Sequence, residues 1–257
     1  MKRAVLWFAA VVATVALTVL IFLPATWLGS FVETRTNGRL TLGDAQGTLW
    51  RGSAFIGGAP GAGGAVTPLL PGRFTWRLSP LVLFGQVDML IENAEALTQP
   101  VNLTGSWSEW ELSPAALLLP AERLAGLGAP FNTLAPSGQM KLSWSTLQIA
   151  RAGNSVALKG HTLLALNDMG SRMAPVKPLG SYVMSMDWQG QSARMNLSTV
   201  RGALLLSGNG ALDNGRFQFS GQAQAADGYE DTLGNLLNLL GQRRMVGGKK
   251  TIALEFK

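Results

Sequence analysis

The sequence predicts a mainly β protein: a single N-terminal transmembrane helix, then a curved antiparallel β-sheet domain, groove-like or half-barrel-like, with one or two short helices. Three observations predict this class. Residues 4–23 form an unbroken apolar run. Later apolar residues recur with a period of two, as in strands with one buried and one wet face. The 31 glycines exceed the typical share of about 7%, which favours short strands joined by tight turns.

The apolar run AVLWFAAVVATVALTVLIFL is long enough to cross a bilayer. At about 1.5 Å of rise per residue it spans about 30 Å, the thickness of the hydrocarbon core. Its many Val, Leu, Ile and Phe residues each favour insertion by roughly 0.3–0.6 kcal/mol. Lys2 and Arg3 precede the run, and no Lys or Arg follows until Arg35. This charge bias predicts a cytoplasmic segment 1–3 and export of the remaining chain.

A cleaved signal peptide is the alternative to this anchor. Signal-peptide apolar cores are usually about 7–15 residues long and end in a small-x-small cleavage site. The present run is longer, and residues 23–27, LPATW, offer no good pair of small residues. Trp7 and Trp27 bracket the run, as aromatic residues do at membrane interfaces, and Pro24 ends the helix. An uncleaved signal-anchor helix over residues 4–23 is therefore the prediction.

Composition excludes several kinds of chemistry. The absence of cysteine rules out disulfides, thiolate nucleophiles and Cys-based zinc sites. The net charge of +6 includes Lys2 and Arg3 and is otherwise spread along the chain. Nucleic-acid binding usually needs a concentrated basic face, so no nucleic-acid partner is expected. The chain has only one histidine and two tyrosines, so its composition argues against acid–base catalysis.

Strand patterns begin after a connector at residues 24–40. Residues 41–52 predict two short strands around a turn, and 57–64, GGAPGAGG, predict a loop that lacks the Gly-Lys-Ser/Thr of a phosphate-binding loop. Asp213–Asn214–Gly215 predicts a tight hairpin turn, and Thr251–Phe256 a final strand. Alternation of apolar and polar residues marks six further strands, over residues 74–78, 87–92, 140–145, 184–189, 194–198 and 216–220.

Two helices are expected within the β domain. Ser113–Pro114 is the pattern of an N-cap with proline at the first helical position, leading into a helix over Ala115–Leu119 that Pro120 kinks or restarts. Later, Leu233, Leu236, Leu237 and Leu240 form one apolar helical stripe. Gly241 is expected to end this second helix, with Arg243 and Arg244 near its negative end. A weak similarity of pattern between the two halves of the chain predicts two similar β units, about 41–112 and 137–257, in one sheet.

The sequence gives only weak indications of catalytic residues. His161 has no second His and no Cys with which to bind a transition metal, so a structural or surface role is favoured. Glu109 and Glu111 share one face of a predicted strand, which is more typical of a solvated face than of a glycosidase pair. No Gly-x-Ser-x-Gly elbow occurs. We predict no catalytic, cofactor-binding or metal-binding residues, no cofactor, and no enzyme.

Tryptophan and methionine residues recur on the apolar side of the strands. Six tryptophans could stack on sugars or peptides, but filling the inner face of a curved sheet is the favoured interpretation; they are Trp50, Trp76, Trp107, Trp110, Trp144 and Trp188. Met140, Met184, Met186 and Met195 could line an adaptable apolar groove.

Several stretches resemble the type II secretion system protein N family. They include LPATWLG after the apolar run, LTLGDAQGTLWRGSA at residues 40–54 and FTWRLSP at residues 74–80. MDWQGQ, TVRGALLLSGNG, RFQFSGQAQA and LGNLLNLLGQRR continue the resemblance in the C-terminal half. The similarity covers most of the chain in order, whereas residues 105–174 match loosely.

The resemblance implies a single-pass protein of the inner membrane of a Gram-negative bacterium, with residues 41–257 in the periplasm. Such a protein would be a non-enzymatic accessory component of the machine that exports folded proteins across the outer membrane. Its expected partners are inner-membrane lipid, other type II secretion subunits and secreted exoproteins. The alternative from a different class is a periplasmic β-groove that shields or transports lipid acyl chains between membranes, which requires an apolar face that is lined but not filled.

Overall fold

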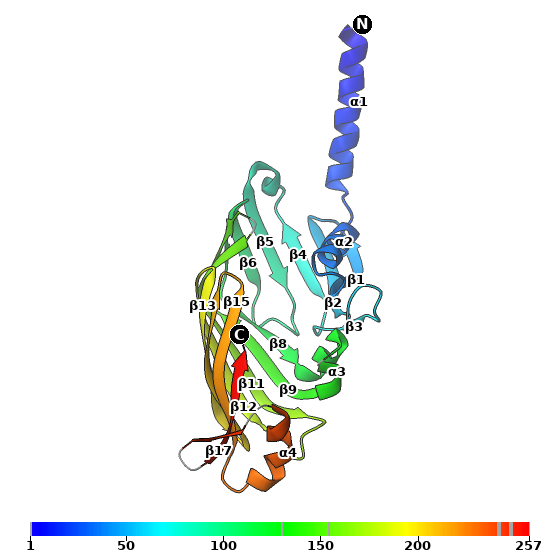
Figure 1. Cartoon of the computed structure of the whole chain (residues 1–257). Coiled ribbons are helices and arrows are strands. Elements are labelled where there is room, and N and C mark those ends of the chain that lie inside the picture. The colour runs from blue at the N-terminus through cyan, green and yellow to red at the C-terminus, as the bar shows by residue number, and fades with distance from the viewer. Residues whose placement is uncertain (1, 130, 154, 241–242, 247–248, 257) are drawn as a thin grey trace.

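The structure, a computed structural model, describes the chain except residues 1, 130, 154, 241–242, 247–248 and 257. One helix stands apart from a long curved sheet that has 17 strands among the described residues (Figure 1). The helices are α1 (Lys2–Ile21), α2 (Thr26–Arg35), α3 (Phe131–Leu134) and α4 (Glu230–Leu240), with two 3₁₀ helices, η1 (Pro80–Phe84) and η2 (Ala121–Leu127). The strands are β1 (Leu40–Gly47), β2 (Arg51–Gly58), β3 (Thr67–Pro68), β4 (Phe74–Leu78), β5 (Gln86–Glu92), β6 (Val101–Ser106), β7 (Glu109–Leu112), β8 (Ala115–Pro120), β9 (Pro136–Trp144), β10 (Leu147–Ala152), β11 (Ser155–Ser171), β12 (Gly180–Gly190), β13 (Ser192–Gly202), β14 (Leu204–Asp213), β15 (Arg216–Ala225), β16 (Arg243–Val246) and β17 (Lys249–Phe256).

The sheet is an antiparallel meander, in which strands pair mainly with their neighbours in the chain. β7 and β8 lie end to end, as do β9 and β10, because the two halves of β11 pair with β10 and with β9. At the C-terminal edge β17 pairs with β15, and β16 pairs with the other side of β17. Such a meander needs only short connections, and the predicted turn at Asn214 and Gly215 has φ of 48° and 80°, as a two-residue hairpin turn requires.

The sequence prediction of a mainly β, antiparallel open sheet is confirmed. Five of the six alternating runs fall within β4, β5, β12, β13 and β15, and the run 140–145 extends one residue beyond the end of β9. The two strands expected in residues 41–52 correspond to β1 and the start of β2. The final strand is β17. Alternation was informative because each of these strands has one apolar and one polar face.

Helix α1 is joined to the sheet through the turn between β1 and β2. The indole nitrogen of Trp50 donates a hydrogen bond to the carbonyl oxygen of Leu20 over 2.8 Å, and the backbone nitrogen of Leu49 donates to Leu23 over 2.8 Å. The side chains of Trp7 and Phe8 are more than 70% exposed. Within the described part of the chain, no helix meets the length and hydropathy required of a membrane span.

The segment expected as a connector, 24–40, contains helix α2, which the sequence analysis did not anticipate. This helix packs beside β1 near a cluster in which Ala25, Ala54 and Trp76 are buried. Leu28 and Leu42 pack against the same cluster. Residues just after α1 are therefore part of the β domain's packing.

The predicted helix at Ala115–Leu119 is wrong, because this segment forms strand β8. Leu117 pairs with Leu142 of β9 across the sheet. The hydroxyl of Ser113 accepts a hydrogen bond from the backbone nitrogen of Asn102 over 2.9 Å, so it does not cap a helix. A short apolar run cannot be assigned to helix or strand by periodicity alone, and here the ladder hydrogen bonds to β9 decide. A helix does restart after Pro120, as η2.

The second predicted helix is α4, with Leu233 fully buried and Leu237 buried. The expected terminator Gly241 lies outside the described residues. Arg243 and Arg244 belong to strand β16, so their backbone does not extend the helix. The apolar stripe was a reliable signal because this helix packs one face on the sheet.

The pKa of Tyr182 on β12 provides a test of how tightly the C-terminal half of the sheet is packed. Its side chain is 4% exposed, and its hydroxyl donates a hydrogen bond to the carbonyl oxygen of Leu204 over 3.0 Å. Burial raises the pKa of Tyr182 to about 12 from the usual 10.0. The unfolded chain therefore loses this proton at lower pH than the folded chain. The stabilisation from Tyr182 is complete below pH 10 and is lost as pH rises towards about 12.

A Tyr229→Phe background isolates this titration, since the chain has two tyrosines. Phenolate absorbance should then rise with a midpoint near pH 12 while the protein is folded. Adding Tyr182→Phe should remove the absorbance change and destabilise the fold by about 1 kcal/mol through the lost hydrogen bond. A midpoint at the ordinary tyrosine value in the folded protein would contradict the burial argument.

Candidate functional site

An apolar concave face follows the curve of the sheet, because the pairing register aligns the apolar positions of successive strands. Leu142 on β9 pairs with Leu164 on β11, which pairs with Met184 on β12. Met186 pairs in turn with Met195 on β13. Cross-strand partners point to the same side of a sheet. Rows of this kind extend from β4 to β15.

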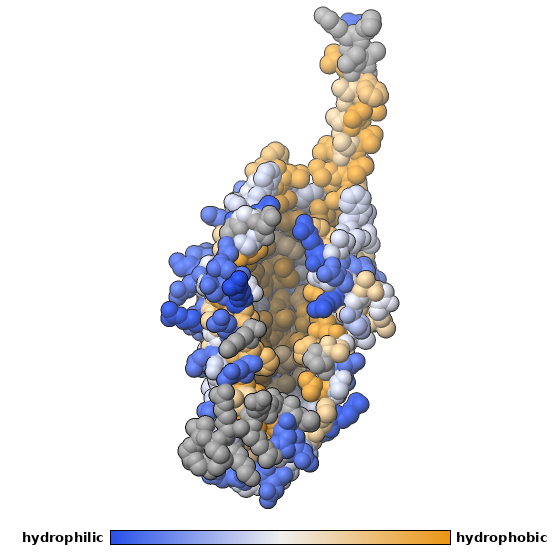
Figure 2. All heavy atoms as spheres, viewed as in Figure 1, coloured by the Kyte–Doolittle hydropathy of each residue, from blue (hydrophilic) through white to orange (hydrophobic). Residues whose placement is uncertain are grey.

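This face is lined with apolar side chains but is not filled. The four methionines at 140, 184, 186 and 195 are all half-buried, as are Leu142 and Leu164. Figure 2 shows the result as a long hollow lined by hydrophobic residues, with hydrophilic residues along its rims. We call this hollow the apolar groove. Met and Leu side chains are flexible or adaptable enough to fit ligands of irregular shape.

Helices close parts of the groove at its two ends. Near α1, helix α2 lies close to β1 beside the cluster around Ala54 and Trp76. At the opposite end, α4 packs on β15 and β17 (Figure 1), where Leu233 contacts a buried cluster that includes Ala223 and Ile252. Each end of the groove therefore holds a buried cluster, whereas the methionines on the concave face between them are half-buried.

The predicted tryptophans divide among different environments. Trp76 is buried in the cluster near α2, and Trp107 is 61% exposed at a turn. Trp110, Trp144 and Trp188 are half-buried on the concave face. The last two donate their indole N–H to the carbonyl oxygen of Ser113 over 2.8 Å and to the hydroxyl of Thr162 over 3.0 Å. With the polar edge satisfied, the ring face is left to line the groove.

The two faces of the sheet differ sharply in charge. The outer face carries polar and charged residues, such as Lys141 and the cross-strand pair Asp187–Arg194. Within β4 to β15, the described registers place one charged residue, Arg151, on the concave side, at the end of β10. A groove of this composition offers van der Waals contact and desolvation to an apolar ligand, and it offers nothing along its length to balance a buried charge.

His161 lies on the outer face, as a surface histidine. Its Nδ1 lies 2.7 Å from an Asp187 carboxylate oxygen, and both side chains are about half exposed. The two residues are direct cross-strand partners. Among the described residues, no group of three His, Asp or Glu side chains is placed to hold a metal ion. The sequence analysis missed Asp187 as the partner, because the pairing depends on the register of β11 and β12.

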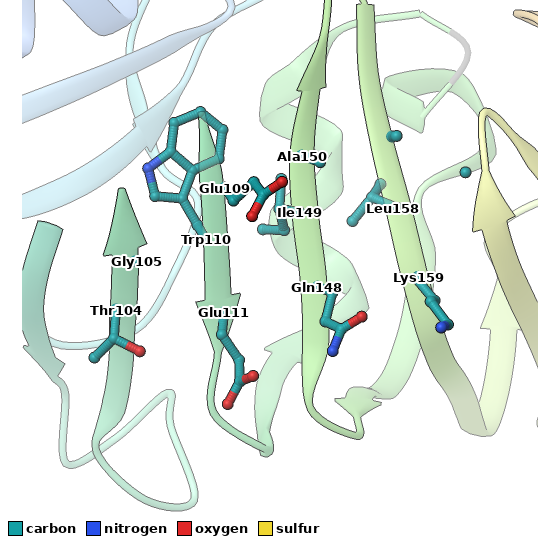
Figure 3. Close-up of a pocket in the computed structure, with 12 residues that line it drawn as sticks. Thr104, Gly105, Glu109, Trp110, Glu111, Gln148, Ile149, Ala150, Leu158 and Lys159 are labelled. Atoms are coloured by element: carbon teal, nitrogen blue, oxygen red, sulfur yellow. The ribbon is translucent and has the colours of Figure 1, made fainter. Parts of the chain in front are cut away.

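Glu109 and Glu111 lie on β7, both exposed, on the wet face of one strand. They border a pocket of about 650 Å³ beside β6, β7, β10 and β11 (Figure 3). Glu111 pairs with Gln148, which pairs with Lys159, and Figure 3 shows these three side chains on adjacent strands. Glycoside hydrolysis needs two carboxylates that face each other across a cleft. Glu109 and Glu111 belong to one strand and do not have this arrangement.

Comparison with known families gives a family model that matches most of the chain. The family model described as "Type II secretion system (T2SS), protein N" matches residues 38–251. No curated protein and no solved structure matches the chain significantly. The match begins just before β1 and ends within β17, so it covers nearly the whole sheet together with α4. The chain belongs to the type II secretion system protein N family.

Proposed function

We propose that this chain is a non-enzymatic accessory component of a type II secretion system, anchored in the inner membrane by α1 and exposing its β domain to the periplasm. Membership of the protein N family carries the proposal. Components of this system act in the export of folded periplasmic proteins across the outer membrane. The open sheet supports a binding or scaffolding role, since its concave face offers a large surface, and the described residues hold no group of three His, Asp or Glu side chains placed to hold a metal ion.

The proposed anchor rests on the surface of α1 and on its charge. Described side chains along the helix are apolar and exposed, including Val11, Val15 and Leu17. No charged residue occurs between Arg3 and Glu33. An exposed helix of this composition is unfavourable in water and favourable in a bilayer. The hydrogen bond from Trp50 to Leu20 would hold the β domain directly at the membrane surface.

Contacts with other secretion subunits are proposed at the edge strand β1 and on the outer face. Among the described residues the strand paired with β1 is β2, and the other edge of β1 is covered at its Gly47 end, where the backbone nitrogen of Ala25 donates to Gly47 over 3.1 Å. The remaining edge can add a strand from another protein. The bulge between Gly43 and Gln46 limits such pairing to part of the strand, since bulges protect edges.

Photo-crosslinking in cells would test these contacts. A photoreactive amino acid at Gln46, on the edge, should crosslink to a secretion subunit, and one at Gln148, in the middle of the outer face, serves as the matched position. Both side chains are exposed. We expect stronger crosslinking at Gln46 and reduced exoprotein secretion after deletion of the gene. Normal secretion in the deletion, with no crosslink to any secretion subunit, would contradict the proposal.

A second candidate function is shielding of lipid acyl chains, and the lined but unfilled groove favours it. Burying apolar surface stabilises a complex by roughly 25 cal/mol per Å², and the half-buried methionines and leucines offer such surface. Native mass spectrometry of the full chain, released from detergent micelles, should then detect bound lipid. Protein free of lipid under conditions that preserve the fold would argue against this function.

A further inference from the structure

The connection between β4 and β5 exposes an unusual apolar surface at one tip of the sheet. It contains η1, with Leu81 48%, Leu83 43% and Phe84 84% exposed. Phe84 is the most exposed large hydrophobic side chain among the described residues, including those of α1. The segment 79–85, SPLVLFG, has no charged residue. An apolar projection of this kind is unfavourable in water and marks an interaction site.

The projection is a built structure. The hydroxyl of Ser79 accepts a hydrogen bond from the backbone nitrogen of Leu81 over 3.3 Å. Gly85, with φ of 92°, ends the turn, and its N–H donates to Val82 over 3.2 Å. The indole of Trp107, from the neighbouring turn between β6 and β7, donates to the carbonyl oxygen of Val82. This bond satisfies the one polar atom of the Trp107 ring while its apolar surface stays exposed. We call η1 together with Trp107 the apolar tip.

A continuous series of hydrogen bonds connects the apolar tip to α1. Trp50 donates to Leu20 at the end of α1, and the backbone nitrogen of Leu78, just before η1, donates to Trp50 over 2.8 Å. The tip therefore projects from the end of the sheet that α1 leaves. Figure 1 shows the β4–β5 connection at that end, and Figure 2 shows hydrophobic atoms there.

A cation stands beside the apolar tip. The backbone nitrogen of Arg151 donates to Ser108, next to Trp107, over 2.7 Å. Arg151 is exposed and lies on the concave side at the end of the groove. Apolar and aromatic residues flanked by a basic side chain are typical of segments that sit in a membrane interface, where cations meet anionic headgroups.

We infer that the apolar tip is a second membrane contact, which inserts into the interface of the bilayer that holds α1, so that the Arg151 end of the groove opens at the membrane surface. The inference rests on the proposed anchoring of α1. Two contacts restrict the orientation of the domain more than one helix can, because a single tether leaves rotation free. The partner is an anionic lipid surface. The apolar tip would contact its acyl region, and Arg151 would contact its phosphate groups.

Site-directed spin labelling of the full chain in nanodiscs of phosphatidylcholine and phosphatidylglycerol tests the inference. The chain has no cysteine, so Leu81→Cys, Val15→Cys and Met173→Cys each give one labelled site. Met173 is 49% exposed and lies in the β11–β12 connection, at the opposite end of the sheet. The measured quantity is the ratio of collisions with oxygen to collisions with a water-soluble nickel complex. We expect this ratio to be several-fold higher for the labels at 81 and 15 than for the label at 173.

Adding Phe84→Asp to Leu81→Cys should lower this ratio several-fold at the tip, whereas Phe84→Leu should preserve it. In the Val15→Cys chain, neither Phe84 change should alter the ratio of oxygen to nickel collisions of the label. Neither change should shift the melting temperature, since Phe84 is exposed. A lipid-exposed label at 15 with a water-exposed label at 81 would overturn the tip contact and leave the anchor intact. A water-exposed label at 15 would overturn both. A label at 81 shielded from oxygen and nickel alike would indicate a protein contact and overturn the lipid assignment.

Discussion

Replacing Leu233 with alanine is expected to lower the free energy of unfolding by about 2–5 kcal/mol, the usual cost of removing a buried leucine side chain. Leu233 is fully buried and joins α4 to the cluster on β15 and β17. The loss should be large because Ile252 and Ala223 on the sheet are themselves buried and have little freedom to fill the cavity.

Asn235→Ala is the matched control, since Asn235 is exposed on the same helix and should change stability by roughly 0.5 kcal/mol or less. Urea unfolding followed by circular dichroism would measure both variants. Equal effects of the two substitutions would show that α4 does not depend on its contact with the sheet.

Introducing a charge into the groove through Met195→Glu is expected to reduce lipid capture by about tenfold or more. Burying an unpaired carboxylate among apolar side chains costs far more than the roughly 1.4 kcal/mol that corresponds to tenfold in affinity. Met195 is half-buried and pairs with Met186 on the concave face, in the open middle of the groove. Lipid-bound and lipid-free protein would be counted by native mass spectrometry.

Asn196→Glu provides the matched control on the same strand. Asn196 is exposed on the outer face, where its amide donates to Asn209 over 2.9 Å. The same charge is then added one residue away, on the opposite side of the sheet. If the Asn196 variant loses lipid as strongly as the Met195 variant, the groove is not the site of lipid binding.

Strand positions were predictable where apolar and polar residues alternate strictly. The run from Met184 to Gln189 became part of β12, because its two faces meet two different environments. The run Ala115–Leu119 was assigned wrongly, because three consecutive leucines carry no period. Its strand conformation depends on pairing with residues 139–144 of β9, which local sequence does not encode.

The candidate site was only partly predictable. The four methionines lie on one face of the sheet, since each follows the period of its strand. The tip at Phe84 and its bond to Trp107 were missed, because η1 and the β6–β7 turn are more than 20 residues apart and neither has a distinctive motif. A short apolar stretch in a turn has the same local pattern whether it is covered or exposed.

The sequence by itself determined the strands in which apolar and polar residues alternate and which face of each of those strands is apolar, because side-chain alternation along a strand has a period of two. It also carried the family resemblance that the family match confirmed. Only the tertiary structure decided what covers the apolar face. Alternation is identical when a second layer fills a core and when the face stays open, since the number of layers depends on how the meander curves and where α2 and α4 dock. Here they dock at the ends, and the middle of the concave face remains an open apolar groove.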